Sequence, residues 1–530
     1  MNGAPPDSSR AFVLGLDGVP WRLIDRWTDA GRLPNFATLC EEGASGPLES
    51  TTPATTPLAW PSIATGVWPD KHGIYGFQKL TSSYSHRMYT SRDIAQPPIW
   101  SQIRPAAVGN VPMTYPPPAI DGAVVSGMMT PGTDREYTHP TSLAADVDDR
   151  IPEYQISLDY PSYADRLEAF EVAIDEVLDA RRGLLDLLAD VVPDWRLFFF
   201  VFTAPDRFQH LVWEDSKLRA HYERLDEILG DVFELVADEP TDLYVVSDHG
   251  FGPIETLVYG NVILEEAGYL TRREDEGTRG ALSSLGISRD SVLGALNAVG
   301  ISDDRLVDVL PRRVVDSVAE RIPGDHSLYD VDYEETTAFL HDAGNLYVND
   351  SARFDHGTVD PADVPEVIDD LVSLFDSVRD PETGDRILEI HDGEDLFPTD
   401  ESSPDLVVTA VDGYEIRKTM ADERFGDPHP TVASHESAGI VLCHGPSFAA
   451  GQHLRGARVV DVAPTLLHSL GEPVPQRADG RVLFDAYRDD ATASRRKVDR
   501  VRLSVREATD EVDDDFAAVE DRLKGLGYME

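Results

Sequence analysis

The chain has 530 residues, 41% of them hydrophobic, and its 96 acidic against 46 basic side chains give a formal net charge of −50. This length and apolar content suit one large α/β domain with insertions, or two to three domains, and they exclude an intrinsically disordered acidic protein. The excess of negative charge also argues against a nucleic-acid partner.

Charge and cysteine content bear on the compartment. At molar salt the Debye length falls to about 3 Å, so a very salty cytoplasm would screen the self-repulsion of such an acidic surface. Cys40 and Cys443 are the only cysteines, which excludes a disulfide framework and a cysteine-based zinc cluster. No apolar run is long enough to cross a bilayer, and residues 1–10 resemble a disordered leader without the apolar segment of a secretion signal. The sequence therefore predicts a halophilic, cytoplasmic protein without a membrane segment, and leaves the oligomeric state unknown.

The first predicted strand ends at a carboxylate. The apolar run Ala11–Leu16 is typical of a short buried strand, and Asp17 follows at its carboxyl end. An aspartate at such a place is commonly a turn residue, but open parallel sheets also bind their ligands at the carboxyl ends of strands. Residues 33–43 then predict a helix that ends at Gly43.

The stretch Thr51–Phe77 combines prolines and hydroxyl residues with a short apolar run. We expect a helix here with Thr56 as its N-cap, Pro57 in the first helical position and an end near Gly66. A hydroxyl at this place faces free backbone amides and the positive end of the helix dipole, which suits a phosphate or a forming alkoxide. An ordinary threonine cap is the alternative, and this segment alone does not decide between the two.

Two further apolar strands are each followed by an Asp and a His. Residues 197–202 precede Asp206 and His210, which are four positions apart and so share one face of a helix. Residues 243–247 end in Asp248-His249. An isolated Asp-His pair is usually structural, but two such pairs at strand ends, with Asp17 at a third, indicate a metal site. The remaining elements predicted in this half are strands at 106–111 and 123–126 and long helices at 163–191 and 217–237.

The second half is interrupted before the strand pattern resumes. Either His429 or His435 could be a ligand in the loop before a predicted strand at 439–443. Other elements are predicted at 338–348, 364–378, 387–390, 406–410 and 460–470. The expected organisation is a leader at 1–10, a catalytic domain at 11–254 and 336–485, an inserted cap at 255–335, and a charged C-terminal tail at 486–530 outside the core.

Several short motifs follow one another along the chain: LGLDG at 14–18, TTPLAWPSIATGVWPDKHG at 55–73, APDRFQH at 204–210, VVSDHGFG at 245–252, SHESAGI at 434–440 and VVDVAPTLLHSLG at 459–471. Together, in this order, they resemble the alkaline phosphatase superfamily, in the branch of type I phosphodiesterases and nucleotide pyrophosphatases. The resemblance covers about residues 11–485, without the middle insertion. It implies an α/β fold, a three-layer sandwich with a mostly parallel central sheet and an inserted cap.

The resemblance also implies two divalent metal ions, usually zinc with manganese as the other possibility, at the carboxyl ends of the strands. It assigns one ion to Asp17, Asp248, His249 and the Thr56 oxygen, and the other to Asp206, His210 and His435. Neutral imidazoles and carboxylates suit zinc or manganese, and two ions about 3.5–4 Å apart can clamp both oxygens of an in-line displacement. Thr56 would then be the nucleophile and form a phospho-threonine, which water releases as phosphate.

Two positions depart from the family's pattern. Nucleotide pyrophosphatases carry asparagines that grip phosphate where this chain has Ala59 and Phe77, which weakens the interpretation as a nucleotide diesterase. The TPL at 56–58 is not the aldehyde-forming motif of sulfatases, and a cofactor-independent phosphoglycerate mutase would have serine as its nucleophile. The pattern is closest to predicted phosphohydrolases or phosphomutases.

The predicted function is a two-metal phosphohydrolase that cleaves a small phosphate ester through Thr56, with a phosphodiester or nucleotide-type ester favoured over a monoester. The first alternative is a phosphotransferase or phosphomutase of the same superfamily, in which an alcohol other than water accepts the phosphoryl group. The second is a non-catalytic metal-binding module that keeps the fold.

Overall fold

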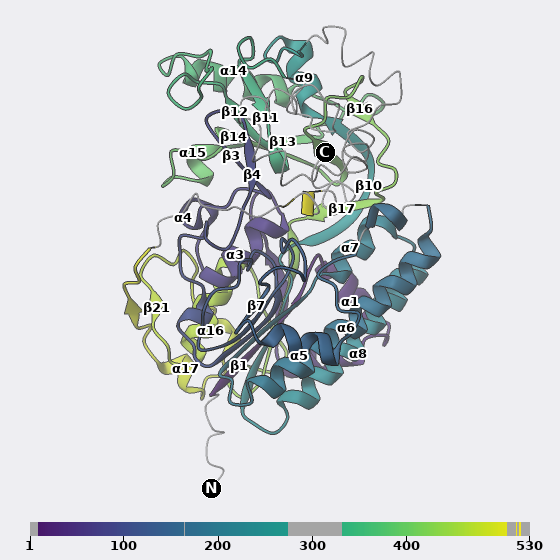
Figure 1. The fold of residues 1–530 in the computed structure, drawn as a ribbon, viewed down its shortest axis with the longest axis vertical. Coiled ribbons are helices and arrows are strands. Elements are labelled where there is room, and N and C mark those ends of the chain that lie inside the picture. The colour runs from purple at the N-terminus through teal and green to yellow at the C-terminus, as the bar shows by residue number, and fades with distance from the viewer. Residues whose placement is uncertain are drawn as a thin grey trace, which may run out of the picture.

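The computed structural model describes residues 9–158, 160–163, 165–273, 331–505, 516 and 519–520. Figure 1 shows a lower part with helices on both sides of a large sheet, and an upper part with smaller sheets. Residues 1–8 of the predicted leader, 274–330 of the predicted cap and most of 506–530 in the predicted tail lie outside the described residues.

A ten-stranded sheet forms the centre of the lower part. Its strands are β1 (Arg10–Leu16), β2 (Ala44–Glu49), β5 (Ala106–Val111), β6 (Gly122–Ser126), β7 (Thr138–His139), β8 (Leu197–Phe202), β9 (Thr241–Val246), β18 (Ala438–His444), β19 (Gln452–His453) and β20 (Ala457–Arg458). β1 pairs in parallel with β8 and β9, and β5 pairs in parallel with β6 and β8. β18 runs antiparallel between β9 and β2. Because most of the other strand pairs are parallel, the sheet is mostly parallel, as predicted.

Both faces of this sheet are buried. Phe12 and Leu14 of β1 point into one apolar core, whereas Ala11 and Val13 point into the core on the other face. The first face is covered by α1 (Trp21–Asp29), α2 (Pro34–Glu42), α5 (Leu143–Arg150), α6 (Leu167–Val191) and α8 (Asp215–Val236), and the second by α3 (Thr56–Thr65) and α16 (Val462–Ser469) (Figure 1). Strands covered on both sides read as continuous apolar runs, which is why the sequence revealed them. The predicted three-layer α/β sandwich is confirmed.

The upper part contains two further four-stranded sheets. In one, β10 (Gly250–Tyr259) pairs with β15 (Gly413–Arg417), β16 (Phe425–Gly426) and β17 (Ala433–Glu436). The other has the order β11 (Ala338–Leu340), β12 (Asn345–Val348), β14 (Leu406–Ala410), β13 (Leu388–Asp392). The helices of this part are α9 (Gly260–Ala267), α14 (Val364–Asp376) and α15 (Gly393–Leu396).

Shorter elements complete the described chain. They are α4 (Pro69–His72), β3 (Gln78–Leu80), β4 (His86–Met88), α7 (Ala204–Leu211), β21 (Val474–Pro475), α17 (Thr492–Arg495) and β22 (Arg500–Val501). Single 3-10 turns lie at Ile99–Ser101, Tyr160–Tyr163, Asp342–Gly344, Val459–Asp461 and Phe484–Ala486.

The strand pairing of the upper sheets does not follow the domain boundaries predicted from the sequence. Residues 255–267, predicted as the beginning of a cap, form the end of β10 and the helix α9. β11 to β14 pair among themselves, and in the part of the chain that the structure describes none of them joins the central sheet. Apolar runs predict where strands lie but not which strands pair. Because residues 274–330 also lie outside the described residues, the domain boundaries 11–254, 255–335 and 336–485 stay predictions.

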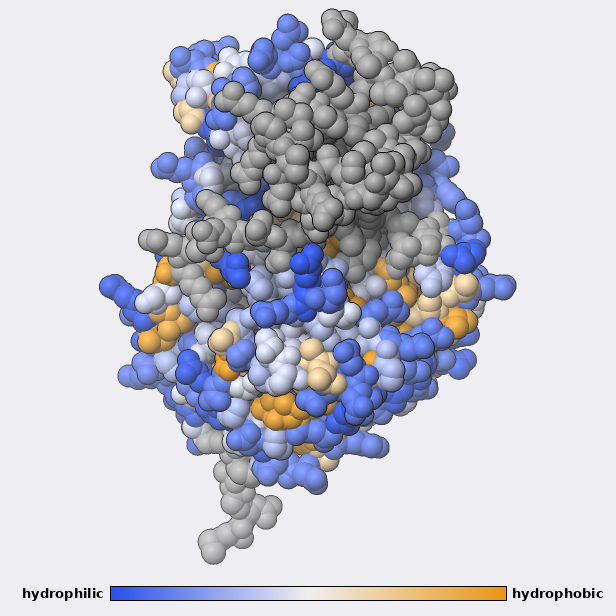
Figure 2. Space-filling model, in the orientation of Figure 1, coloured by the Kyte–Doolittle hydropathy of each residue, from blue (hydrophilic) through white to orange (hydrophobic). Residues whose placement is uncertain are grey.

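The surface agrees with the composition. The visible face in Figure 2 is mostly hydrophilic, with scattered apolar residues among the charged ones. None of the described helices combines the length and the apolarity needed to cross a bilayer.

Part of the predicted tail packs onto the protein. Phe516 is 8% exposed and Val519 is 2% exposed, and both belong to an apolar cluster that includes Phe77 and Tyr115. The rings of Phe516 and Tyr115 lie 6.1 Å apart in an edge-to-face arrangement. Ala486, Tyr487 and Ala493 are also buried, in the apolar core on the second face of the central sheet. The expectation that the tail lies outside the core is therefore wrong for these five residues, because isolated apolar residues in a charged stretch form no periodic pattern.

Phe516→Ser is expected to lower the free energy of unfolding by about 2 kcal/mol, because it replaces a buried aromatic ring by a polar group. Thermal and denaturant unfolding in high salt measure the change. The matched control is Val505→Ser in the same tail, since Val505 is 42% exposed and should be neutral. Equal melting temperatures of the two variants would contradict the contact.

Candidate active site

Three neighbouring strands of the central sheet end beside one another at candidate metal ligands. Asp17 directly follows β1, Asp206 and His210 lie on α7 just after β8, and Asp248-His249 follow β9 after one serine. β8 and β9 flank β1 in parallel, so their carboxyl ends meet at one edge of the sheet. The parallel pairing thus gathers side chains that are far apart in the sequence.

His435 reaches the same edge from the upper part. It lies on β17, where it pairs opposite Phe251 of β10. Since β10 begins directly after His249, its pairing with β17 carries His435 over the end of β9. The rings of His249 and His435 are 4.0 Å apart. His429, the other candidate, is exposed and donates its backbone N–H to Asp427, away from the cluster.

The helix α3 begins one residue earlier than predicted. Thr55 is the N-cap, and its carbonyl accepts the N–H groups of Leu58 and Ala59. Thr56 is the first helical residue and Pro57 the second. The prediction that Thr56 is the N-cap is wrong, because both threonines precede a proline-led apolar run and the sequence does not separate them.

The shift leaves the Thr56 hydroxyl facing the cluster. Thr56 is fully buried, and its Oγ1 lies 3.4 Å from Asp17 Oδ1 and 3.3 Å from His249 Nε2. A hydroxyl in the first turn of a helix, beside free backbone amides, is well placed for chemistry on an anionic group.

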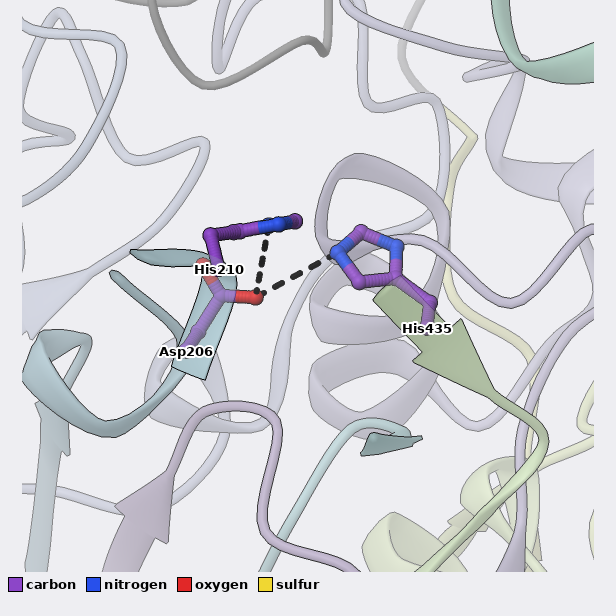
Figure 3. Close-up of side chains that lie close together, drawn as sticks. All are labelled: Asp206, His210 and His435. Carbon is purple, nitrogen blue, oxygen red and sulfur yellow. Dashed lines mark ion pairs between the residues drawn. The ribbon is translucent and has the colours of Figure 1, made fainter. Parts of the chain in front are cut away.

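The candidate ligand atoms form two overlapping groups. In the first, Asp206 Oδ2 lies 3.7 Å from His210 Nε2 and 3.3 Å from His435 Nε2 (Figure 3). The second consists of Asp17, Asp206 and His249, and within each group the ligand atoms lie within 4.8 Å of one another. Asp248 adjoins the second group, with Oδ2 3.3 Å from His249 Nε2. Asp206 therefore belongs to both groups.

Each histidine of the cluster is oriented by a backbone carbonyl. Nδ1 of His210 lies 3.1 Å from the Ala433 oxygen, Nδ1 of His249 lies 3.0 Å from the Gly250 oxygen, and Nδ1 of His435 lies 3.1 Å from the Ala54 oxygen. A carbonyl can only accept, so Nδ1 carries the proton and Nε2 keeps its lone pair for the cluster. This arrangement is common behind histidine ligands of metals.

Each carboxylate is likewise held through one oxygen. Trp60 Nε1 donates to Asp17 Oδ2 at 3.3 Å, the Gly18 N–H donates to Asp248 Oδ1 at 3.2 Å, and Arg207 Nη1 pairs with Asp206 Oδ1 at 2.8 Å. The second oxygen of each carboxylate faces the cluster. Sequence analysis did not identify Trp60 or Arg207, although Trp60 lies one helical turn after Thr56 and Arg207 directly follows Asp206.

Burial and crowding shift the ionisation of these groups. Burial, and then the charges of Asp248 and Asp206, raise the pKa of Asp17 well above its ordinary value. Burial and the charge of Asp206 raise the pKa of Asp248 to about 7. Burial would also raise the pKa of Asp206, but Arg207 and the nearby histidines hold it below its usual range.

Burial lowers the pKa of all three histidines, so their rings are neutral at neutral pH: His210, His249 and His435.

A divalent cation fits this donor set. Asp248 Oδ2 is buried without a hydrogen-bond donor among the described residues, and like charges crowd around it. A nearby cation would relieve the repulsion that raises the carboxyl pKa values. Neutral imidazoles and carboxylates are also ligands that zinc and manganese accept.

Residues 11–439 match the profile of the family described as type I phosphodiesterase / nucleotide pyrophosphatase. The chain belongs to this family. The resemblance inferred from the motifs is thereby confirmed. The matched residues include the central strands β1, β8 and β9, Thr56 and every other candidate ligand, and they end at the start of β18.

Individual relatives match more narrowly. The 2,3-bisphosphoglycerate-independent phosphoglycerate mutases of two strains of Cereibacter sphaeroides are 40% and 38% identical over 81 residues, which is 15% of this chain and 15% of each mutase. Murine ectonucleotide pyrophosphatase / phosphodiesterase 5, as an inactive variant in complex with AMP, is 13% identical with a TM-score of 0.48, over 88% of this chain and 96% of that chain. The same murine protein without AMP has a TM-score of 0.47.

The two residues that depart from the pattern of this phosphodiesterase family have buried apolar side chains. Ala59 is fully buried, and Phe77 is 2% exposed in the cluster that also contains Met128 and Phe516. The backbone N–H of Phe77 donates to Asp342 Oδ2 at 2.5 Å. Neither side chain can donate a hydrogen bond to a phosphate oxygen, so any such donor must come from elsewhere.

A cavity of ≈ 710 Å³ adjoins the cluster at His435. It lies between the loop Thr51–Thr55 and the upper strands β10, β14 and β15, and among its described lining residues none is a lysine or an arginine. Its acidic lining residues are Glu49, Glu389, Asp412, Glu415 and Glu436. The volume is within the range of small-ligand sites.

Divalent metal is expected to raise the melting temperature more at about pH 8 than at about pH 5.5. The raised pKa of Asp17 and that of Asp248, raised from 3.8 to about 7, mean that the metal-free folded protein holds these protons more tightly than the unfolded chain. Its stability therefore falls as the pH rises from about 4 towards 7. A bound cation offsets this loss as the carboxylates ionise, so the stabilisation grows over that range.

Thermal unfolding with zinc, with manganese and with a chelator, in high-salt buffers across this pH range, measures the effect. A metal-induced shift of the same size at every pH would contradict the assigned carboxylates.

Proposed function

We propose that this member of the phosphodiesterase family is a metal-dependent hydrolase of small phosphate esters, with Thr56 as its nucleophile and two divalent ions as cofactors. The observation that carries the proposal is the position of Thr56 Oγ1, which is 3.3 Å from His249 and 3.4 Å from Asp17 within two overlapping groups of ligands. A nucleophile beside paired cation sites is the arrangement that in-line phosphoryl transfer requires.

The residues divide into two ligand sets. Asp17, Asp248, His249 and Thr56 would hold one ion, and Asp206, His210 and His435 the other. Zinc is the expected metal and manganese the second possibility. The two ions would supply the positive charge that favours ionisation of the attacking hydroxyl and balances charge on the phosphate and leaving oxygens.

The chain's own groups account for the remaining steps. Thr56 Oγ1 attacks phosphorus, and the bond to the leaving oxygen breaks as that oxygen departs as an alcohol. Thr56 then carries the phosphoryl group, which in the case of a diester is still esterified to the second alcohol, until water releases it. Trp60, the Gly18 N–H and Arg207 keep the three carboxylates oriented during this exchange. Complete burial of Thr56, Asp17 and Asp248 limits access of bulk water to the reacting groups.

The family supports a phosphodiester or nucleotide-type substrate over a monoester. The cavity beside His435 offers space for the organic group of such an ester. The absence of asparagine at Ala59 and Phe77 separates this site from that of nucleotide pyrophosphatases. A panel of phosphodiesters with different organic groups would therefore identify the preferred substrate.

Phosphotransfer to an acceptor other than water is the second candidate. It is supported by the 81-residue matches to phosphoglycerate mutases, although these span only 15% of either chain. Added alcohols separate the two functions. A hydrolase passes the phosphoryl group to water and releases phosphate from a monoester or a phosphate monoester from a diester, whereas a transferase forms an ester with the added alcohol. A non-catalytic metal-binding module would do neither.

The deciding experiment combines metal content with turnover. The full chain, purified in high salt, is analysed for bound metal and assayed on aryl phosphate monoesters and diesters with zinc or manganese. Two bound ions with diester hydrolysis support the proposal. Two ions without turnover of any ester support the binding module, and turnover in the complete absence of metal contradicts the mechanism.

A cytoplasmic location at high salt is part of the same proposal. It is supported by the net charge of −50 and by the two free cysteines.

A further inference from the structure

The three carboxylates of the cluster are held by different kinds of partner. Asp17 is held by an indole and Asp248 by a backbone amide, both neutral donors. Asp206 is held by the guanidinium of Arg207. Asp206 is also the carboxylate common to both groups of ligands. The charged partner therefore acts on the carboxylate whose orientation affects both sites.

Arg207 is itself enclosed. It is 2% exposed, its Nη1 donates to Asp206 Oδ1 at 2.8 Å, and its Nη2 lies 2.6 Å from the sulfur of Met128. Its guanidinium also lies 5.8 Å from the ring centre of Tyr160. A thioether is a weak acceptor and an aromatic face a soft one, so among these three contacts the Asp206 carboxylate is the strongest.

The two oxygens of the Asp206 carboxylate have different partners. Arg207 takes Oδ1, and Oδ2 lies 3.3 Å from His435 Nε2, 3.7 Å from His210 Nε2 and 4.0 Å from His249 Nε2. Rotation of the carboxylate would move Oδ2 away from all three imidazoles. Neighbouring residues on a helix do not normally face each other, so the Arg207 side chain folds back along α7 to make this contact.

We propose that Arg207 is a positioning residue that fixes the Asp206 carboxylate with Oδ2 towards His210 and His435, with which Asp206 would hold one ion, and beside His249 of the other site. This inference rests on the proposed two-metal function and adds a residue that the ligand assignment does not contain. Arginine suits the role because its guanidinium stays protonated at all working pH values and its rigid fork sets the direction of the bond. The orientation of Asp206 would then not depend on pH.

The inference predicts a loss of metal affinity that extra metal can overcome. Removal of a group that orients a ligand typically costs about 10- to 100-fold in metal affinity. We expect Arg207→Met to bind zinc or manganese about 10- to 100-fold more weakly than the parent. Arg207→Lys keeps the charge but not the fork, so its affinity should lie between the two. Saturating metal should restore most of the turnover of both variants.

A buried arginine elsewhere provides the matched control. Arg181, on α6, is also 2% exposed and also lies over a tyrosine ring, that of Tyr154. It donates to the backbone oxygens of Gln155 and Ile156, which precede α6 in the chain. Arg181→Met removes a comparable buried charge with no contact to the cluster. It is expected to lower the melting temperature and to leave metal affinity unchanged.

Metal dissociation constants of the full chain and the three variants, from competition with a chelator in high salt, test the inference. It is overturned if Arg207→Met binds metal as tightly as the parent, or if Arg181→Met loses affinity to the same extent. If Arg207→Met does not fold, the test uses Arg207→Lys instead. The inference is then overturned if Arg207→Lys binds metal as tightly as the parent and added metal does not restore its activity. A parent that binds no metal refutes the proposed function instead.

Discussion

Thr56→Ala is expected to lower kcat for phosphate esters by about three orders of magnitude or more, because it removes the attacking oxygen. Metal content should stay close to that of the parent, since six other side chains are available as ligands. Steady-state turnover on the best substrate of the panel measures the loss. Acid quenching followed by mass spectrometry should detect a phosphoryl adduct on Thr56 in the parent and none in the variant; the adduct is phosphate from a monoester, and phosphate that keeps the second ester group from a diester.

The neighbouring threonine supplies the control. Thr55 is 9% exposed, and its Oγ1 has no hydrogen-bond partner among the described residues. Thr55→Ala should therefore retain activity within a few-fold, and Thr56→Ser should retain a measurable part of it. Full activity in Thr56→Ala, or a larger loss in Thr55→Ala than in Thr56→Ala, would show that the nucleophile is assigned wrongly.

His435→Ala is expected to lose about one of the two bound metal ions and to lower kcat by two orders of magnitude or more. His435 Nε2 lies 3.3 Å from Asp206 Oδ2, and its Nδ1 is held by the Ala54 carbonyl, so the ring is fixed with Nε2 towards Asp206 and its removal leaves that site one ligand short. Metal stoichiometry by atomic spectroscopy, measured beside turnover, follows both effects.

His429→Ala, in the loop that leads into β17, is the matched comparison. His429 is exposed and contacts Asp427 through its backbone, so its removal should change neither metal content nor turnover. The opposite result, with metal lost from His429→Ala and retained in His435→Ala, would reverse the ligand assignment and imply that the loop closes differently in the working enzyme.

Much of the candidate site could be predicted because its residues stand at the ends of apolar strands. β8 is apolar throughout, and β1 and β9 are apolar after their first one or two residues, since helices cover both faces of the central sheet. Parallel strands bring their carboxyl ends to one edge, so Asp17, Asp206 and Asp248 were expected to meet before any contact was known. The i, i+4 spacing of Asp206 and His210 likewise predicted one helical face.

Other features depended on contacts that no local pattern contains. Thr55 and Thr56 are chemically alike, and only the backbone geometry of α3 makes the first the cap and turns the second towards the cluster. The residues alone left both His429 and His435 open, and the family motifs favoured His435. The pairing of β17 with β10 then brings His435 to the cluster. Phe516 was hidden in a charged tail because a lone aromatic residue carries no periodicity.

The sequence by itself determined the family and the three-layer fold of this protein, and it singled out the Asp, His and Thr residues that we propose to hold metal and attack phosphorus. These follow from local composition and from the fixed direction of parallel strands. Only the tertiary structure decided which oxygen and which nitrogen of each residue faces the cluster, because that choice is made by outer partners such as Trp60, Arg207 and the Ala54 carbonyl. Such partners come together through packing in three dimensions, and the local sequence around each ligand does not predict which partner it has.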